Sequence, residues 1–365
     1  MPRTAQRPFL FPEPKAMLQT RKTTRPPKAV LPAVPFPTSA SVKAAQSPSG
    51  PVRKPSGKQA VKAGKAAALP APLPPFVSRD AALQVLWQQW QPGVARDAGR
   101  AADAMPPPID LLRYAPASKP FSSGKGKAHD KALVSELAQD LDGLQNVFYA
   151  DRRFKLLVIL QGMDAAGKDG TLRGVFSQMT PLGVRTVGWK APTETEKARD
   201  YLWRIHLQAP ASGEIVVFNR SHYEDVLVPV VNRWITPEQQ AQRYAQINDF
   251  ERMLSETGTV VVKFMLHISK EEQRQRLQER LDDPTKHWKF DEGDLQVRAQ
   301  WDDYQQAYAR LLAATHTPWA PWTIVPADSK THRNLMIATL LREVLHNLGL
   351  QYPPGAPALD KIKVK

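Results

Sequence analysis

The sequence predicts an α/β fold, a five-stranded parallel sheet flanked by helices. From residue 155 onward, five short apolar runs rich in β-branched residues each precede a longer segment whose apolar residues recur at helical spacing. Strands and helices that alternate in this way form a parallel sheet with helices on its faces. With 365 residues and 42% hydrophobic content, the chain is also long enough to bury a sizeable core.

Two helical segments precede the first predicted strand. Residues 80–90 and 131–150 show the periodicity of helices. In the second segment Leu133, Leu137 and Leu141 are four residues apart, which places them on one face of a helix. We expect both helices to pack against the sheet as an N-terminal extension of the domain.

The predicted strands and helices then alternate along the chain. The strands are residues 155–160, 184–189, 214–219, 259–268 and 322–327. The helices that follow them are residues 168–179, 195–207, 237–256, 270–281 and 333–348, with a further long helix at 300–312.

The basic residues are concentrated before this domain. Residues 1–75 contain thirteen Lys and Arg and one acid, Glu13, so they carry +12 of the formal net charge of +15 and leave +3 for the remaining chain. Their Pro-, Ala-, Ser- and Lys-rich composition lacks apolar periodicity, which predicts a disordered basic N-terminal tail. Such a tail is either solvated or a tether for nucleic acid or another acidic partner. The domain is expected at 76–355, with a short C-terminal tail at 356–365.

Composition excludes several classes of protein. The chain has no cysteine, which excludes disulfides and thiolate metal sites and suits a reducing compartment. Its apolar runs are shorter than the roughly twenty residues of a membrane span. The sixteen prolines of residues 1–75 oppose the amphipathic helix of an organelle-targeting peptide. We therefore expect a cytoplasmic protein with no membrane partner.

A glycine loop joins the first predicted strand to the next helix. The stretch GMDAAGK, residues 162–168, has the spacing of a phosphate-binding loop in the required strand-to-helix context. Its glycines let the backbone amides surround an anion at a helix N-terminus, and Lys168 adds a positive charge. The predicted phosphate-binding residues are Gly162, Ala165, Ala166, Gly167, Lys168 and Gly170.

Two acids make this loop unusual. Asp169 stands where such loops normally have a hydroxyl side chain, and Asp164 lies inside the loop. A carboxylate beside bound phosphate repels it unless a cation lies between them, so Asp164 and Asp169 are predicted ligands of a divalent metal. The alternative is a pair of solvated loop acids.

The third predicted strand ends in a second polar group, in the sequence FNRSHYED. The carboxyl end of this strand is expected beside the phosphate loop. Arg220 can pair with phosphate oxygens and stabilise the charge of a transferring group, and we predict a catalytic role for Arg220 together with Asp164, Lys168 and Asp169. Asn219 stands where an Asp is usual, so the metal-anchoring role passes either to a water held by Asn219 or to Glu224 and Asp225 one turn onward. Alternatively, Arg220 pairs structurally with Glu224 or Asp225.

A basic helix and a Lys-rich loop follow the fourth predicted strand. At about 270–294, a position where phosphoryl-transfer enzymes commonly carry a mobile lid, Arg276, Arg280, Lys286 and Lys289 could close over an anionic chain. The alternative is a solvated helix with charge pairs, to which Arg274 is assigned. The eight His residues show no metal-ligand spacing, so no zinc site is predicted.

Taken together, the motifs GMDAAGKDGT, KAPT, FNRSHYEDVL, INDFERML, DDPTKHWKF and APWTIVPAD resemble the polyphosphate kinase 2 family, in chain order over about residues 111–353. The resemblance implies a P-loop kinase-like fold with a helical lid. It also implies transfer of a phosphoryl group between inorganic polyphosphate and a nucleotide, with Mg²⁺, or Mn²⁺ in its place, as cofactor. A homo-oligomer is implied in the same way.

The resemblance also assigns roles to residues. It implies that Asp164 and Asp169 hold the metal, and that Lys168, Arg220, Arg280 and the lid lysines contact polyphosphate. The sequence NRSHYED is similar to that of class III members, which implies AMP and ADP as acceptors and ADP and ATP as products. Thr331 departs from the family, which often has an aromatic residue there. The residues assigned to the nucleotide acceptor are Lys190, Thr193, Asn219, Glu224 and Asp225.

Other functions remain compatible with parts of the sequence. An ATP-dependent nucleoside monophosphate kinase could use the same loop, although the additional acids oppose it. A nucleic-acid- or polyanion-binding protein could depend on the basic tail alone. The mechanism that we expect is in-line phosphoryl transfer without a covalent intermediate, in which the protein mainly positions groups and stabilises charge.

Overall fold

The computed structural model describes residues 76–93, 106–355, 359, 362 and 364. The predicted basic tail, residues 1–75, lies outside the described residues, as does most of the predicted C-terminal tail at 356–365. The domain predicted from 76 to 355 accounts for nearly all of the structure described below.

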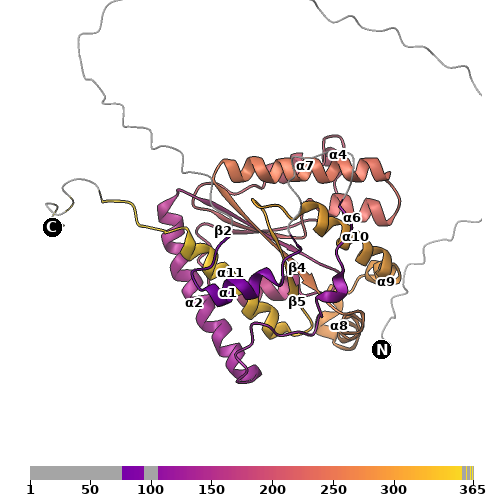
Figure 1. Cartoon of the computed structure of the whole chain (residues 1–365), viewed down its shortest axis with the longest axis horizontal. Helices are drawn as coiled ribbons and strands as arrows, with labels where there is room; N and C mark the ends of the chain where they lie inside the picture. The colour runs from indigo at the N-terminus through magenta and orange to yellow at the C-terminus, as the bar shows by residue number, and fades with distance from the viewer. Residues whose placement is uncertain (1–75, 94–105, 356–358, 360–361, 363, 365) are drawn as a thin grey trace, which may run out of the picture. The chain divides into compact units, whose positions relative to one another are not determined.

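The five-stranded parallel sheet is confirmed, with the strand order β2-β3-β1-β4-β5 (Figure 1). In the centre of the sheet Val158 lies opposite Val217 on one side and Val262 on the other. Because β1 has neighbours on both sides and helices on both faces, it is a continuous apolar run rather than an alternating one. The strands are β1 (Lys155–Gln161), β2 (Val184–Gly188), β3 (Ile215–Asn219), β4 (Thr259–His267) and β5 (Trp322–Pro326).

Helices cover both faces of the sheet. Figure 1 shows α2 (Lys127–Asp151) and α11 (Lys330–Asn347) together on one face. The other face is covered by α6 (Glu224–Val231), α7 (Pro237–Glu256) and α10 (Trp301–Thr315).

The N-terminal segment protects the edge strand β5. Trp87, in α1 (Ala81–Gln88), is 1% exposed, and its indole Nε1 donates to Thr323 Oγ1 at 2.7 Å. The amide of Ile324 donates to the carbonyl of Trp90 at 2.8 Å. The segment predicted as a packing helix therefore satisfies backbone groups that an exposed edge strand would leave open.

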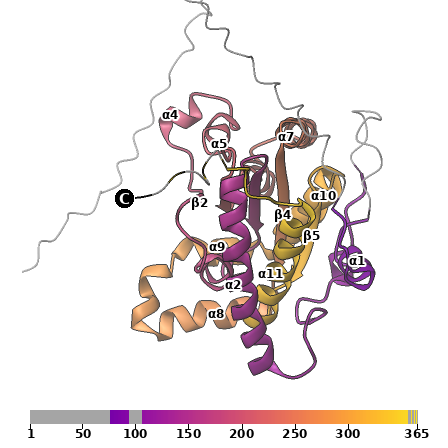
Figure 2. The ribbon, with the colours of Figure 1, turned by 90° about the vertical axis from the view of Figure 1, so that its left-hand side faces the viewer.

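The lid predicted at 270–294 forms a helical hairpin-like unit. It consists of α8 (Lys270–Asp282), a 3₁₀ helix (Pro284–Lys289) and α9 (Glu292–Ala299). Figure 2 shows α8 and α9 standing out together beside the sheet. A second 3₁₀ helix, Leu111–Arg113, precedes α2.

Two predicted helices are divided in the structure. The helix expected at 168–179 begins as α3 (Lys168–Thr171) and continues as a π-helical turn, Leu172–Phe176. The helix expected at 195–207 is two short helices, α4 (Glu194–Lys197) and α5 (Trp203–His206). Asp200 divides them, because its carboxylate accepts from the amide of Leu202 and so begins a new turn.

Helices α6 and α9 were not predicted. The sequence of α6, EDVLVPVV, contains four valines and Pro229, which favour strand or loop rather than helix. Its packing against α7 and α10 outweighs that local preference.

None of the helices in the described part of the chain combines the length and apolar content that crossing a membrane requires.

A charged network lies inside the apolar core. Lys263 of β4 donates from Nζ to Glu251 Oε2 at 2.6 Å, and both side chains are 0% exposed. Lys263 also donates to the carbonyl of Thr315 at 2.7 Å, while Tyr223 donates its hydroxyl to Glu251 at 2.7 Å. Burial alone would raise the pKa of Glu251, but Lys263 and His222 bring it below its usual value.

Candidate active site

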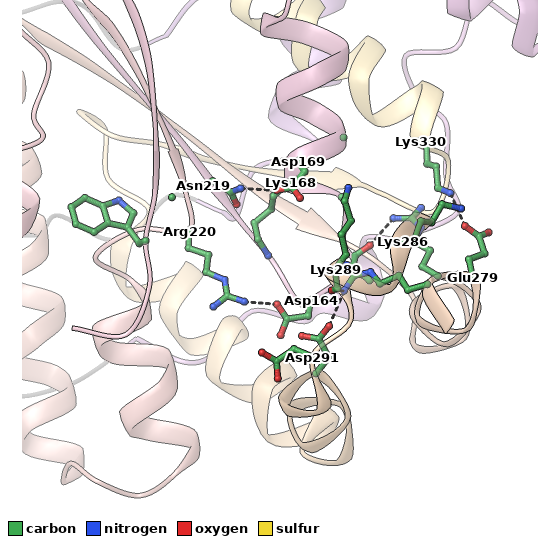
Figure 3. A pocket seen from close by; sticks show the side chains of 18 of the residues that line it. Asp164, Lys168, Asp169, Asn219, Arg220, Glu279, Lys286, Lys289, Asp291 and Lys330 are labelled. Atoms are coloured by element: carbon green, nitrogen blue, oxygen red, sulfur yellow. Dashed lines mark hydrogen bonds and ion pairs between the residues drawn. The ribbon is translucent and has the colours of Figure 1, made fainter. Parts of the chain in front are cut away.

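A cavity of about 490 Å³ lies where the loop after β1 meets the end of β3 and the lid (Figure 3). In this strand order β3 and β4 lie on either side of β1, so the position is the one where open parallel sheets bind ligands. Eight basic and five acidic side chains line the cavity. The excess of positive charge suits an anionic ligand.

The loop after β1 adopts the geometry of an anion nest. Gly162 and Gly167 have φ angles of 147° and 107°, and Ala165 has a φ of 62°. A left-handed alanine costs free energy, and such backbone strain is concentrated at functional sites. The loop predicted from GMDAAGK therefore has the backbone conformation that the prediction required.

The side chain of Lys168 folds back toward the start of its own loop. Its Nζ donates to the carbonyls of Gly162 at 2.7 Å and Met163 at 3.3 Å. The residue is 9% exposed and lines the cavity. Burial lowers the pKa of Lys168, although Asp164 opposes the shift. A partly desolvated ammonium group at this position gains strongly from an anion bound in the loop.

Two arginines support the loop from below. Arg276 donates from Nη1 to the carbonyls of Ala165 at 3.0 Å and Ala166 at 3.1 Å. Its Nη2 donates to the carbonyls of Ala327 at 2.7 Å and Asp328 at 2.8 Å. The expectation that Arg276 closes over an anionic chain with the lid needs correction. The side chain is 6% exposed and its guanidinium is occupied by backbone carbonyls, so it holds the loop in shape.

Arg333 was missed by the sequence analysis. It is 2% exposed and donates to the carbonyl of Ala166 at 3.3 Å and to Asn334 Oδ1 at 2.9 Å. Among the described residues no carboxylate forms an ion pair with it. Burial and the neighbouring Arg276 lower the pKa of Arg333 to about 9. No local motif marks this residue, because its role depends on α11 passing under the loop.

Gly167→Ala is expected to distort the loop. A Cβ at Gly167 would lie 1.8 Å from Arg333 Nη1, and the φ of 107° strains any other residue. We expect a loss of about 1–3 kcal/mol in the free energy of unfolding and a larger loss of phosphate binding. Gly143→Ala in α2, where the added Cβ meets nothing within 4 Å, is the matched control and should not destabilise the protein. Equal urea midpoints for the two variants would contradict the close packing at Gly167.

Arg220 reaches from the end of β3 to the loop. Its φ is 65°, a left-handed conformation, and its Nη2 lies 2.6 Å from Asp164 Oδ1 (Figure 3). Burial would raise the pKa of Asp164, but Lys168 and Arg220 hold it below its usual value. The alternative in which Arg220 pairs with Glu224 or Asp225 is wrong for this conformation. Asp164, Lys168 and Arg220 come together as expected from the sequence.

Asp169, directly after Lys168, is the second acid of the loop region that lines the cavity. Its Oδ1 accepts from Asn219 Nδ2 at 2.8 Å, and both residues line the cavity with Asp164. Within the described residues no group of three His, Cys, Asp or Glu could hold a metal ion. Mg²⁺ commonly uses one or two carboxylates and completes its coordination with water and substrate phosphates. Asp164 and Asp169 supply two carboxylates to the lining of the cavity, and this donor type fits such an ion.

The predicted acceptor residues are divided by the structure. Lys190 and Asn219 line the cavity, whereas Thr193, Glu224 and Asp225 do not. Thr193 begins α4 by accepting from the amide of Glu196. Asp225 is linked to the cavity through Arg204. The Asp225 Oδ2 lies 3.0 Å from Arg204 Nη2, and Arg204 Nη1 donates to the carbonyl of Lys190 at 2.9 Å. Glu224 accepts from Gln161 Nε2 at the end of β1.

The lid contributes charged groups to the cavity. Arg280 lies 2.7 Å from Asp294 Oδ2, and Lys286 lies 3.0 Å from Asp283 Oδ2. Lys289 lines the cavity as well, whereas Arg274 pairs with Glu271 on the exposed face of α8, as expected. Sequence reasoning missed several lining residues because they lie outside its motifs or between them: Trp189, Glu279, Asp291, Asp294 and Lys330.

This arrangement can hold two anionic groups close together. The loop and Lys168 offer amides and a positive charge to one phosphate chain, and Arg220 adds a second positive charge from the end of β3. Arg280, Lys286 and Lys289 of the lid segment line the cavity as well and add further positive charge. Such a site lowers the barrier to phosphoryl transfer by positioning the reactants and by neutralising charge on the transferring group.

Comparisons with known proteins show what this chain is similar to. The family model described as Polyphosphate kinase 2 (PPK2) matches residues 124–351. An AMP/ADP-polyphosphate phosphotransferase of Meiothermus ruber is 49% identical over 258 residues, which are 70% of this chain and 96% of the relative. An ADP-polyphosphate phosphotransferase of Rhodopseudomonas palustris is 38% identical over 265 residues, 69% of this chain and 91% of the relative. The crystal structure of polyphosphate kinase 2 from Arthrobacter aurescens TC1 has a TM-score of 0.67 and 42% identity, and the match covers 74% of this chain and 97% of that one.

Proposed function

The chain belongs to the polyphosphate kinase 2 family, and from this premise we propose that it transfers a terminal phosphoryl group from inorganic polyphosphate to AMP and to ADP. The chain is an enzyme of the phosphotransferase kind. The observation that carries the proposal is the group formed by Lys168, Arg220 and Asp164, which faces a net-positive cavity at the end of the sheet. The relative from Meiothermus ruber supports AMP and ADP as acceptors through its name.

The reaction is an in-line displacement. An oxygen of the acceptor's terminal phosphate attacks the terminal phosphorus of polyphosphate, and the bond to the bridging oxygen breaks. The shortened polyphosphate leaves with the electron pair of that bond. Lys168 and the loop amides orient the donor, while Arg220 neutralises charge on the transferring group. Arg276 and Arg333 hold the loop carbonyls so that its amides stay directed into the cavity. No side chain forms a covalent intermediate.

The test is nucleotide production from polyphosphate without ATP. Purified protein is mixed with polyphosphate, Mg²⁺ and either AMP or ADP, and the products are separated by chromatography. ADP and ATP from AMP would support both acceptors, whereas ATP from ADP alone would narrow the proposal to one. No product with polyphosphate, together with activity on ATP and AMP, would assign the protein to the ATP-dependent monophosphate kinases.

We propose Mg²⁺ as the cofactor, held by Asp164 and Asp169. When bound, it would supply positive charge that offsets the negative charge of the donor and acceptor phosphates. Treatment with a chelator followed by gel filtration is expected to reduce turnover to below about 1%, and Mg²⁺ or Mn²⁺ should restore it. Full turnover in the chelator-treated protein would contradict a metal requirement. The near-ultraviolet circular dichroism spectrum of the chelator-treated protein should match that of the untreated protein, because Arg276 and Arg333 hold the loop in place.

Two further proposals concern the role of the basic tail and the assembly state of the protein. We propose that residues 1–75 supply polyanion binding without taking part in catalysis, because they carry most of the positive charge. Deleting them should weaken retention on heparin and leave turnover unchanged.

Light scattering of the full-length protein and of the protein without residues 1–75 tests the homo-oligomer expected from the resemblance. A cytoplasmic location is proposed from the nucleotide substrates and the absence of cysteine.

A further inference from the structure

The backbone of Arg220 has a conformation that neighbouring residues must hold in place. Its φ of 65° lies in the left-handed region, which costs free energy for a residue with a side chain. The amide of Arg220 donates to the carbonyl of Leu160 in β1 at 3.0 Å. Figure 3 shows the side chain of Arg220 directed at Asp164. The direction of this guanidinium therefore depends on what fixes the turn after β3.

The last residue of β1, Gln161, has a buried amide that contacts this turn with both of its ends. The residue is 0% exposed. Its Oε1 accepts from Ser221 Oγ at 3.2 Å, and its Nε2 donates to Glu224 Oε1. A carboxylate can only accept, so the amide nitrogen must face Glu224 and the amide oxygen Ser221. Because a buried amide is costly unless both ends are paired, these two contacts fix the turn against β1.

Gln161 also connects the two positive groups of the site along the backbone. It directly precedes Gly162, whose carbonyl accepts from Lys168 Nζ at 2.7 Å. Ser221, its partner on the other side, directly follows Arg220. The loop with Lys168 and the turn with Arg220 are therefore joined through this one side chain.

Glu224 acts on Arg220 through its charge. Burial would lower the pKa of Arg220, but the charges of Glu224 and Asp164 raise it above its usual value. Among the described residues Arg220 forms an ion pair with Asp164 alone. Glu224 does not line the cavity, so the hydrogen bond from Gln161 holds this carboxylate where it attracts the guanidinium without meeting a ligand.

We propose that Gln161 is a positioning residue for phosphoryl transfer, which acts through Arg220 by holding the turn at 220–224 against the end of β1. This inference rests on the proposed function. Gln161 does not line the cavity and so contacts neither donor nor acceptor. Its loss should displace the guanidinium that neutralises charge on the transferring group, and a displacement of about 1 Å can cost about 10²-fold in rate.

The first variant is Gln161→Glu, which keeps the size of the side chain and the acceptor for Ser221 but removes the donor to Glu224. Two carboxylates then face each other, and the turn should move away from β1. With polyphosphate and AMP, kcat is expected to fall about 10²-fold, while the KM for polyphosphate changes less than about threefold.

A reciprocal variant should restore the activity. Gln161→Glu/Glu224→Gln exchanges the donor and the acceptor and keeps one negative charge in the pair, so both hydrogen bonds can form again. We expect its kcat to return to within about fivefold of the wild-type value.

A double-mutant cycle tests whether Gln161 acts through Arg220. In Arg220→Ala the guanidinium is absent, so adding Gln161→Glu should lower kcat by no more than about twofold. A residue that only stabilised the fold would lower kcat by the same factor in both backgrounds.

The matched control is Gln240→Glu, the same substitution at another buried glutamine. Gln240 lies in α7, is 3% exposed and donates to the hydroxyl of Tyr244 at 2.8 Å, outside the cavity lining. Its kcat and KM should stay within about twofold of wild type. Urea unfolding shows whether each variant is folded. If Gln161→Glu is not, Ser221→Ala removes one of the two hydrogen bonds and should lower kcat about fivefold, with no further loss in Arg220→Ala.

The outcomes separate this inference from the proposed function. If the wild type uses ATP with AMP but not polyphosphate, the proposed function fails, and the same cycle with ATP tests Gln161. If the wild type uses polyphosphate and both Gln161→Glu and Ser221→Ala keep kcat within about twofold, the inference fails alone. Independent losses with Arg220→Ala, or a folded reciprocal variant without recovery, also overturn it. A wild type inactive with both donors overturns both.

Discussion

Lys168→Ala is expected to lower kcat by about 10³-fold or more and to leave the fold intact. The Lys168 ammonium lies 2.7 Å from the Gly162 carbonyl, at the base of the nest in which the donor phosphate is proposed to sit. Removing it takes away a preformed positive charge from a partly desolvated site, where charge stabilisation is strongest. Steady-state kinetics with polyphosphate and AMP measure the loss.

Two controls test whether the loss of turnover is specific to Lys168 and is not caused by unfolding. Lys197→Ala removes an exposed lysine that pairs with Glu194 and should retain wild-type turnover. Urea unfolding of Lys168→Ala should show a cooperative transition, because Arg276 and Arg333 still hold the loop carbonyls. A folded Lys168→Ala protein with near-normal turnover would remove this lysine from the mechanism.

Glu251→Gln is expected to produce the largest loss of stability, about 3–5 kcal/mol in the free energy of unfolding. The substitution leaves the Lys263 ammonium at 0% exposure without a counter-charge. It also weakens the acceptor that His222 and Tyr223 share. Urea denaturation followed by circular dichroism gives the change in unfolding free energy.

The control is the same substitution at the surface. Glu271→Gln breaks the exposed pair with Arg274 and should barely change the unfolding midpoint. The double variant Glu251→Gln/Lys263→Met should lose less stability than Glu251→Gln alone, because no buried charge is left unpaired. A Glu251→Gln protein as stable as Glu271→Gln would mean that the buried pair does not hold the core together.

The sheet and the phosphate loop could be read from the sequence because their signals are local. Each predicted strand agrees with the observed one to within one residue at either end. A strand buried on both faces must be apolar along its whole length, so β1 and β4 are visible as continuous runs. Residues 162–168 are consecutive, so their spacing alone determines that Gly162 and Lys168 come together.

Elements whose packing opposes their local preference could not be read in this way. The valines and Pro229 of α6 favour other structures, and only contacts with α7 and α10 make the segment helical. Arg276 was assigned to the lid because it lies in a basic helix. Its buried position became apparent only with the carbonyls of Ala165 and Ala327 around it, which come from segments far apart in the sequence.

The sequence by itself determined the α/β class, the phosphate loop, the charged residues at the end of β3 and the family. These depend on periodicity and on residues close together in the chain. Only the tertiary structure decided that Asp164 pairs with Arg220, that Arg333 lies under Gly167 and that Lys330 lines the active-site cavity. The physical reason is that electrostatic and packing energies depend on distances in space, and chain folding sets those distances between residues that no local pattern connects.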